Sequence, residues 1–395
     1  MDRTNTIFVV TEFKRDSKIE SYWYECFHHS DFYDWDVRIV DGTFIENSDS
    51  FLYSDTYFKS IQLRAILDLI NKKQIKDGDI FVFANAWNYA AIPLSYFREE
   101  FQMNIHMIGM WGDSLFNQQS PMWHRFKGKS KQWGRQVELA LFNAYDMNAF
   151  FDRNQWDMFR RKYSISGKRS NQGEVTSRYA ITGYPFGYLA EESPFSEIKK
   201  DVIIFPYSLS NDLQRDMFRG MATELPQYEF VFAQESFNNR VLYHGLLKDA
   251  KAMFCAEFSE YNPVLLYEGM LSGVYPMVPD RLMYTDMFPD RYRYPQIIPG
   301  MRHDKIMYLL RNRYQLKEYI AGIMENYDVL KNTLLRDARK IGKQYQNDPF
   351  KQMLIDVAGR PPKYASRRVR DKYRTRKMEP VEDSIQPIDR NRLQI

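Results

Sequence analysis

The stretch FCAEFSEYNPVLLYEGMLSGVYPMVPDRL, residues 254–282, has the pattern of a strand, a helix and a second strand. Its first residues continue the apolar run AKAMF and predict a buried strand that ends near Phe258. Asn262-Pro263 predicts a helix start, because Asn accepts hydrogen bonds from the first free backbone amides and Pro suits the first helical turn. The helix carries VLLYEGMLS, and Gly273 is expected as its C-cap. The run GVYPMVPD then predicts the next strand.

Two carboxylates lie eight positions apart in this stretch. Glu260 falls in the loop at the carboxyl end of the strand, beside free amides and the positive end of a helix dipole, a place that attracts phosphate. Glu268 lies about two turns into the helix, from where its carboxylate could reach the same crevice and accept hydrogen bonds from vicinal hydroxyls. A phosphate site beside an acid that binds ribose suggests a nucleotide-sugar donor. Two solvated acids flanking a core helix are the plainer alternative.

Length and composition favour a large folded protein. The chain has 395 residues, 44% of them hydrophobic, and a formal net charge of only +4, so any nucleic-acid role needs local clustering of charge. Cys26 and Cys255 cannot form a disulfide framework, which favours a reducing compartment. The sequence shows neither a signal peptide nor an apolar segment long enough to span a membrane. We therefore expect a cytoplasmic protein with no membrane partner.

The first half alternates strands and helices. Apolar runs predict strands at 6–13, 35–42, 80–83 and 104–114, and the spacing of Ile61 to Ile70 predicts a helix. Residues 133–158 also have a helical pattern, and 164–189 resemble a loop. Buried strands separated by helices indicate a parallel sheet covered on both faces.

The second half repeats this organisation. Strands are expected in KKDVIIFPYSLS, QYEFVFAQE, AKAMFCAEF and GVYPMVPD, with helices between them and a helical pattern over 305–346. The predicted fold is α/β, with two Rossmann-like lobes facing a central cleft, a C-terminal helical segment and a basic tail. We place an acceptor lobe at 1–175, a nucleotide-sugar lobe with the C-terminal helices at 176–347, and a basic extended tail at 348–395.

SEYNPVLLYEGMLSGVYPMVPD resembles the paired-glutamate signature of glycosyltransferases of the GT-B fold. VIIFPYSLS, LLYEGMLSGVYPMVPDRLMYTDMFP and ITGYPFGYL are similar to bacteriophage glycosyltransferases associated with sugar decoration of hydroxymethylated DNA bases, within roughly 181–289. The resemblance implies that Glu268 binds the donor ribose, and that Glu260 and the amides near Tyr261 and Asn262 hold the sugar and its diphosphate. It implies a nucleotide-diphosphate sugar as donor substrate, and neither a cofactor nor a metal ion.

The loop after the first strand of the second half departs from this family pattern. GT-B enzymes usually carry an arginine and a lysine there, whereas FPYSLSNDLQRD has Ser208 and Leu213 at those places. Such cations stabilise the charge of the departing diphosphate. Arg215, slightly further along, and Arg281, after MVPD, are the candidate replacements.

Asp113, in MWGDSLF, follows a predicted strand of the first lobe and is expected near the cleft. It could act as a catalytic base or bind the acceptor, and it could equally cap the next helix.

The last distinctive segment is basic. GRPPKYASRRVRDKYRTRK, residues 359–377, has nine cations against one acid. A solvated tail, a phosphate-binding arm and an arm that docks on another protein all fit this composition. The candidate nucleic-acid-binding residues are Arg367, Arg368, Arg370, Lys372, Arg374 and Arg376.

The sequence thus predicts a glycosyltransferase that moves a hexose or pentose to an acceptor hydroxyl, with hydroxymethylated phage DNA as favoured acceptor. For a bacteriophage protein, the compartment is the host cytoplasm. The alternative is a GT-B-like module without turnover that serves a phage assembly as a binding or structural part, with the tail as its docking arm.

Overall fold

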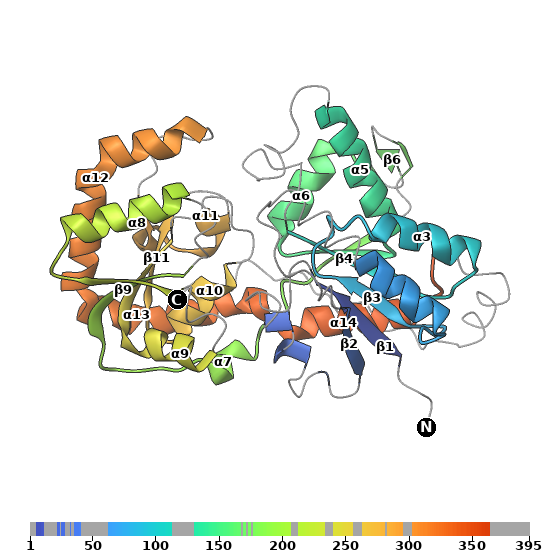
Figure 1. The fold of residues 1–395 in the computed structure, drawn as a ribbon, viewed down its shortest axis with the longest axis horizontal. Coiled ribbons are helices and arrows are strands. Elements are labelled where there is room, and N and C mark those ends of the chain that lie inside the picture. Colours follow the sequence, from blue (N-terminus) through green and yellow to red (C-terminus); the bar gives the residue numbers. More distant parts are fainter. Residues whose placement is uncertain are drawn as a thin grey trace, which may run out of the picture.

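The computed structural model describes most of the chain between residues 5 and 363. The described ranges are 5–11, 22–23, 25–27, 32, 35–40, 62–112, 130–166, 169–170, 173–174, 177–206, 212–233, 240–255, 263–280, 283–294 and 302–363. Two sheets lie in it side by side, each flanked by helices (Figure 1). Strands of the first sheet come from residues 6–181 and those of the second from residues 200–294.

The first sheet is parallel throughout, with the strand order β2-β1-β3-β4-β5-β8. Its strands are β1 (Thr6–Val10), β2 (Asp36–Val40), β3 (Ile80–Phe83), β4 (His106–Trp111), β5 (Met147–Phe150) and β8 (Arg178–Ile181). The helices of this part are α3 (Ala91–Glu100), α5 (Ser130–Ala144) and α6 (Arg153–Lys162), with a helical segment at 62–71. A short antiparallel pair, β6 (Arg169–Ser170) and β7 (Gly173–Glu174), follows α6. We call this part the first lobe.

The second sheet is also parallel, with the order β10-β9-β11-β12-β13. Its strands are β9 (Lys200–Phe205), β10 (Glu229–Phe232), β11 (Ala250–Phe254), β12 (Tyr275–Pro279) and β13 (Arg293–Tyr294). The accompanying helices are α7 (Leu189–Glu192), α8 (Asp212–Glu224), α9 (Arg240–Asp249), α10 (Val264–Leu271), α11 (Met283–Met287) and the 3-10 turn η3 (Asp290–Tyr292). We call this part the second lobe.

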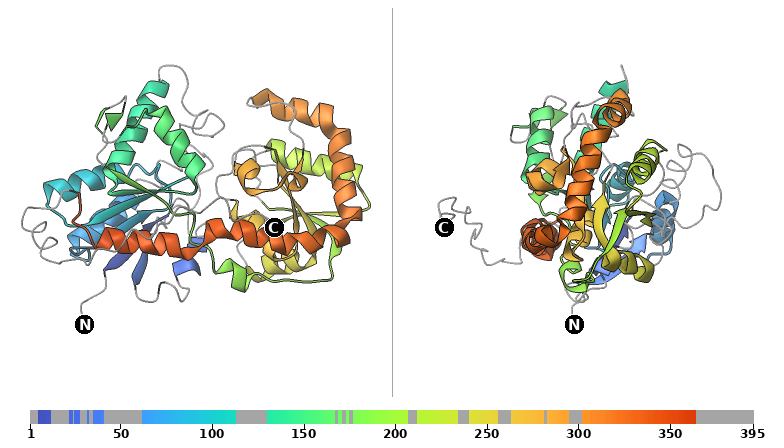
Figure 2. Two further views of the ribbon diagram at one scale, coloured as in Figure 1. Left: turned by 180° about the vertical axis from the view of Figure 1, so that it is seen from behind. Right: turned by 90° about the vertical axis from the view of Figure 1, so that its left-hand side faces the viewer.

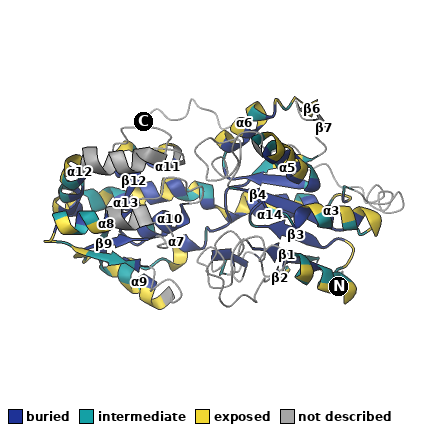
Figure 3. Ribbon diagram, turned by 45° about the horizontal axis from the view of Figure 1, so that its top comes forward, coloured by how far each residue is buried: buried dark blue, intermediate teal, exposed yellow. Residues whose placement is uncertain are grey.

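Strand burial explains why these sequences form central parallel strands. All residues of β3, β4 and β12 are buried, as are the last four of β9. A parallel strand covered by helices on both faces needs such continuous apolar runs. The strands are accordingly the dark centre of each lobe when the ribbon is coloured by burial (Figure 3).

The C-terminal helices link the two lobes. They are α12 (Arg302–Glu325), α13 (Tyr327–Ile341), the 3-10 turn η4 (Gly342–Tyr345) and α14 (Asn347–Ala358). From α13 to α14 the chain runs behind the molecule from the second lobe to the first (Figure 2). There Phe350 of α14 packs against Trp23, with ring centroids 6.0 Å apart, and against Phe27 and Phe32.

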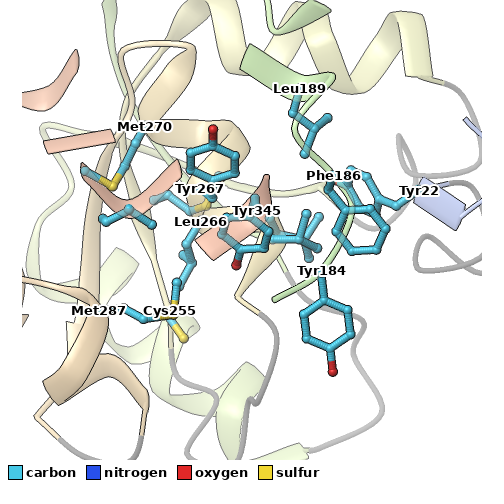
Figure 4. Close-up of a cluster of buried hydrophobic side chains, with 14 of the residues drawn as sticks. Tyr22, Tyr184, Phe186, Leu189, Cys255, Leu266, Tyr267, Met270, Met287 and Tyr345 are labelled. Atoms are coloured by element: carbon cyan, nitrogen blue, oxygen red, sulfur yellow. The ribbon is translucent and has the colours of Figure 1, made fainter. Parts of the chain in front are cut away.

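An aromatic cluster fills the junction of the lobes. Tyr345 stacks on Tyr267 of α10, with centroids 4.5 Å apart, and lies on its other side near Phe186 (Figure 4). The two segments that cross between the lobes, 182–189 and 342–346, are hydrogen-bonded, since the amide of Tyr184 donates to the carbonyl of Gln344. One continuous core therefore joins the lobes.

Three segments differ from the sequence-based expectation. The helical pattern over 133–158 contains strand β5, whose four residues MNAF carry no β-branched side chain. Strand β8 lies beyond the expected boundary at 175 but pairs with β5 in the first sheet. Residues 348–358, expected in the extended tail, belong to helix α14, whose buried Phe350, Met353, Leu354 and Val357 pack inward.

Candidate functional site

In the second sheet, the position between β9 and β11 is the expected place for a ligand. From β9 the chain passes outward to β10 and then returns to β11 on the other side, so the strand order reverses between these neighbours. In open parallel α/β sheets, ligands bind outside the carboxyl ends of the strands at this position. The strands end at Phe205 and Phe254, and the segment with Glu260 and Asn262 follows β11 directly.

Helix α10 follows that segment, but it starts one residue later than the Asn262-Pro263 pattern predicts. It begins at Val264 with Pro263 as its N-cap residue, and no side chain accepts a hydrogen bond there. It ends in a Schellman motif, because the amide of Gly273 donates to Met270 and that of Val274 to Gly269. Gly273 has φ +81°, so the expected glycine at this end is confirmed. A Cβ on Gly269 would come within 2.8 Å of Met253 Cε, which shows how closely α10 packs on β11.

Glu268 is the buried acid of α10. Its side chain is fully buried, and a buried carboxylate requires hydrogen-bond donors around it. The hydroxyl of Tyr22 donates to its Oε2, and Nε2 of His244 lies 3.1 Å from its Oε1. The carboxylate thus connects three separate elements: the segment at 22–27, helix α9 and helix α10.

These contacts make Glu268 different from a solvated helix acid. The side chain of His244 is 26% exposed, so it is the member of the group that solvent reaches. Tyr22 is 1% exposed and is held in place by the ring of Phe186 and by the hydroxyl of Tyr188, which donates to its carbonyl. Sequence reasoning missed both partners: Tyr22 is one of many aromatic residues in ESYWYECFHH, and His244 has no motif around it.

Most of the other predicted donor-site residues lie outside the described ranges. Glu260, Tyr261, Asn262 and Arg281 are among them, and so is Asp113, which follows the described end of β4 by two residues. Arg215 lies on α8, but its side chain is not described.

The first sheet has an equivalent position between β1 and β3, where its strand order reverses. Buried polar side chains gather there. Gln62 donates to the carbonyl of Thr11 after β1, and Asn88 donates to Gln62 Oε1 at 2.9 Å. Asn85 Oδ1 accepts from the amide of Trp87 at 2.8 Å. The sequence ANAWN, directly after a buried strand, is the local signal for this network.

Residues just before β5 anchor the end of the described chain to the first lobe. Asp146 accepts hydrogen bonds from Arg98 and from the amides of Met107 and Lys363. The Lys363 side chain donates to the carbonyl of Asn143, and burial lowers its pKa to about 8. The six candidate nucleic-acid-binding residues, 367–376, follow outside the described ranges.

Two general findings concern ligands and membranes. Within the described ranges, no group of three or more His, Cys, Asp or Glu side chains is placed to hold a metal ion. None of the helices in those ranges combines the length and apolar composition that crossing a membrane requires.

Comparison with solved structures identifies the fold. Sucrose-phosphate synthase from Thermosynechococcus elongatus is similar with a TM-score of 0.53 and 11% identity, over 89% of this chain and 98% of that one. T4 phage BGT in complex with UDP-glucose matches with a TM-score of 0.45 and 11% identity, over 89% and 99%. A chain of the GtfA/B complex matches with a TM-score of 0.45 and 9% identity, and the alignment spans 75% of this chain but only 61% of that one.

No protein-family model matches the sequence, and no curated protein matches it either. The two parallel sheets with helices around them and the similarity to the synthase structure show an α/β fold of the GT-B type. The fold predicted from the sequence is confirmed.

Proposed function

We propose that this chain is a glycosyltransferase that moves a sugar from a nucleotide-diphosphate sugar to an acceptor hydroxyl. The second lobe holds the donor and the first lobe the acceptor. Hydroxymethylated DNA is the favoured acceptor, on the resemblance of residues 181–289 to bacteriophage enzymes. The GT-B fold is compatible with this chemistry, but the proposal depends on the residues of the second lobe.

One observation carries the proposal. Helix α10 begins beside the β9–β11 position where the strand order reverses, and two glutamates eight residues apart belong to this one strand–loop–helix unit. The helix N-terminus favours a diphosphate, and Glu268 provides a carboxylate for ribose hydroxyls. Arg215 and Arg281 are the proposed cations for the leaving diphosphate, and Asp113 the proposed base on the acceptor side.

Ligand-induced stabilisation tests donor binding directly. The melting temperature of the full chain is measured with UDP, UDP-glucose and the corresponding GDP and ADP sugars at millimolar concentration. A ligand present at 100 times its Kd adds about 2.7 kcal/mol to the free energy of unfolding. Glu260→Gln should reduce this increment, whereas Glu318→Gln, at an exposed position of α12, should leave it unchanged. If none of the nucleotides stabilises the wild type, the donor site is refuted.

The leaving-group cations are tested by turnover. With donor bound, Arg215→Gln or Arg281→Gln should lower kcat more than it raises KM, because charge on the diphosphate develops towards the transition state. Equal losses of donor affinity and of kcat/KM would instead assign that arginine to donor binding alone.

A second candidate function is a GT-B-like module without turnover. It is favoured by the state of Glu268, whose two carboxylate oxygens already contact Tyr22 and His244. It is also favoured by Ser208 and Leu213 at the places where the related enzymes carry cations. Donor binding without transfer to hydroxymethylated DNA or to any other offered acceptor would support this function.

A further inference from the structure

A group of cations lies on the inward side of helix α5. Lys131, Arg135, Glu138 and Phe142 follow one another at helical spacing of four, three and four residues, so they form one stripe. Glu138 and Phe142 are fully buried, which shows that the stripe faces the interior of the lobe. Towards the helix N-terminus the same stripe changes from the buried Glu138 and Phe142 to the two cations. An inward stripe with cations is expected only where it extends past the core.

The end of α6 adds a third cation to this stripe. The hydroxyl of Tyr163 donates to Oε2 of Glu138, which brings the neighbouring Lys162 close to α5. Burial lowers the pKa of Lys162, and the positive charges of Arg135 and Lys131 lower it further, although Glu138 acts in the opposite direction. We define Lys131, Arg135 and Lys162 as the α5–α6 basic surface.

Acidic residues are scarce near this surface in the sequence. The sequence has no Asp or Glu from position 114 to 137. Glu138, the nearest acid in the sequence, already accepts hydrogen bonds from Trp87 and Tyr163. Lys131 lies in the first turn of α5, where the helix dipole disfavours a cation. The Nε of Arg135 is buried and has no hydrogen-bond partner in the described part of the chain, an arrangement that costs free energy unless a ligand satisfies it.

The surface lies towards the carboxyl edge of the first sheet. Only two residues separate the end of α5 at Ala144 from the start of β5 at Met147, so α5 runs antiparallel to the strands and its N-terminus points to their carboxyl edge. Trp87, which follows β3 at that edge, donates to Glu138 Oε1 at 2.9 Å. The cations therefore lie beyond Glu138 on the side of this carboxyl edge, the edge of the sheet at which Gln62, Asn85 and Asn88 also gather.

We propose that the α5–α6 basic surface binds a phosphate group of the acceptor, so that the acceptor is a phosphate-bearing molecule. This inference rests on the proposed glycosyltransferase function, because it assigns the acceptor to the first lobe. A nucleic-acid backbone and a sugar phosphate present the same chemistry to these cations. A bilayer surface does not fit, since the stripe faces inward and the outer side of α5 carries Gln132 and Gln136 around a single exposed Trp133.

The test compares two charge-neutralised variants of the full chain. Lys131→Gln combined with Lys162→Gln removes two cations of the surface and leaves Arg135, with its buried atom, in place. Arg339→Gln combined with Lys340→Gln removes two exposed cations of α13 as a matched control. Binding of a fluorescent single-stranded DNA 20-mer and of glucose 6-phosphate is measured for both variants and the wild type, across a range of salt concentrations.

The surface variant should bind the single-stranded DNA, glucose 6-phosphate or both at least tenfold more weakly than the control. For DNA, the slope of log affinity against log salt should fall by about 1.4, at roughly 0.7 for each lost single-strand phosphate contact. The ligand that responds identifies the source of the phosphate. Equal affinities of the two variants, or a wild type that binds neither ligand, would overturn the inference.

The donor measurement separates this inference from the proposed function. If nucleotide sugars stabilise the chain but the surface variant behaves like the control, the inference is wrong and the proposed function stands. If the surface binds phosphate but no nucleotide sugar stabilises the chain, the basic surface stands as a binding site and the glycosyltransferase proposal falls. Binding to anionic vesicles, lost in the surface variant and without any binding of DNA or glucose 6-phosphate, would also refute the inference.

Discussion

The hydroxyl of Tyr22 donates a hydrogen bond to Oε2 of Glu268, although 246 positions separate the two residues in the sequence. The bond joins the segment between β1 and β2 to helix α10, whose N-terminus belongs to the proposed donor site. Because Glu268 Oε1 contacts His244, the two oxygens of the carboxylate both have protein partners. A donor ribose that binds Glu268 must therefore compete with a phenol and an imidazole.

Tyr22→Phe should strengthen donor binding. The variant keeps the aromatic ring that packs on Phe186 but releases Oε2 of Glu268 for ribose hydroxyls. The free energy of unfolding without ligand should fall by about 1.5–3 kcal/mol, the usual contribution of a hydrogen bond to a charged group. The melting-temperature increment caused by UDP or UDP-glucose should rise. Tyr327→Phe, which removes a buried hydroxyl that donates to Gly273, is the control and should not change the increment. A smaller increment in Tyr22→Phe would mean that Tyr22 orients Glu268 for the donor.

Truncation at two neighbouring positions should separate the tail from the fold. A chain that ends at Lys363 keeps the contacts of this residue with Asp146 and Asn143, whereas a chain that ends at Gly359 loses them. We expect the first to melt like the full chain and the second to melt at a lower temperature. If residues 364–377 bind phosphates, the chain ending at Lys363 should also bind all DNA sequences more weakly, with a flatter salt dependence.

Two other outcomes of the truncation would assign the tail differently. Unchanged DNA affinity together with lost self-association or assembly would indicate a protein-docking arm. If the chain that ends at Lys363 matches the full chain in both assays, residues 364–377 are only solvated charge.

His106 should make the protein less stable in mild acid. Burial lowers its pKa to about 4; Asp146 nearby acts to raise it and Arg98 to lower it. Between pH 6.5 and 4 the unfolded chain therefore holds a proton that the folded chain does not, and stability falls as pH decreases through this window. This one group contributes at most about 1.4 kcal/mol per pH unit. Urea unfolding of His106→Gln at pH 7 and 4.5 should show a smaller difference than the wild type, and an equal difference would refute the assignment.

Gly183→Ala should destabilise the junction of the lobes. Gly183 has φ +61°, and a Cβ there would lie 2.0 Å from the carbonyl oxygen of Gln344. The left-handed conformation and the displacement of one crossing segment together should cost about 2–4 kcal/mol. Gly220→Ala is the matched control: it lies inside α8 with nothing within 4 Å of the new methyl group, so it should stabilise by about 0.5–1 kcal/mol. The melting temperatures of the two variants are compared with that of the wild type, and equal changes would contradict the role assigned to Gly183.

Local patterns in the sequence predict most of the strands and the start of α10 to within one residue, because continuous apolar runs and an Asn-Pro pair act over a few residues. Strand β8 is missed, since it lies in the stretch 164–189 that resembles a loop. The same reasoning failed for β5, where MNAF is too short and too weakly β-forming to interrupt the helical pattern around it. Helix α14 was assigned to the tail because its apolar face becomes visible only against Trp23, Phe27 and Phe32, which lie more than 300 positions earlier.

The residues of the candidate site also differ in whether local sequence patterns identify them. Glu268 and Gly273 could be predicted, since spacing and turn chemistry identify them. Tyr22 and His244 could not, because nothing local distinguishes a residue whose partner lies on another element. The sequence shows that Lys131 and Arg135 lie in a stretch without acids. It does not show that they lie on the inward side of α5, because this depends on how the helix packs.

The position of α14 has a consequence for synthesis on the ribosome. The residues of the first sheet leave the ribosome first, but the aromatic surface of Trp23, Phe27 and Phe32 is covered by Phe350, which is made only after the whole second sheet. The first lobe therefore receives its last aromatic contact only after the second sheet has been made. Until Phe350 has left the ribosome, this aromatic surface lacks that cover and can bind chaperones or other nascent chains.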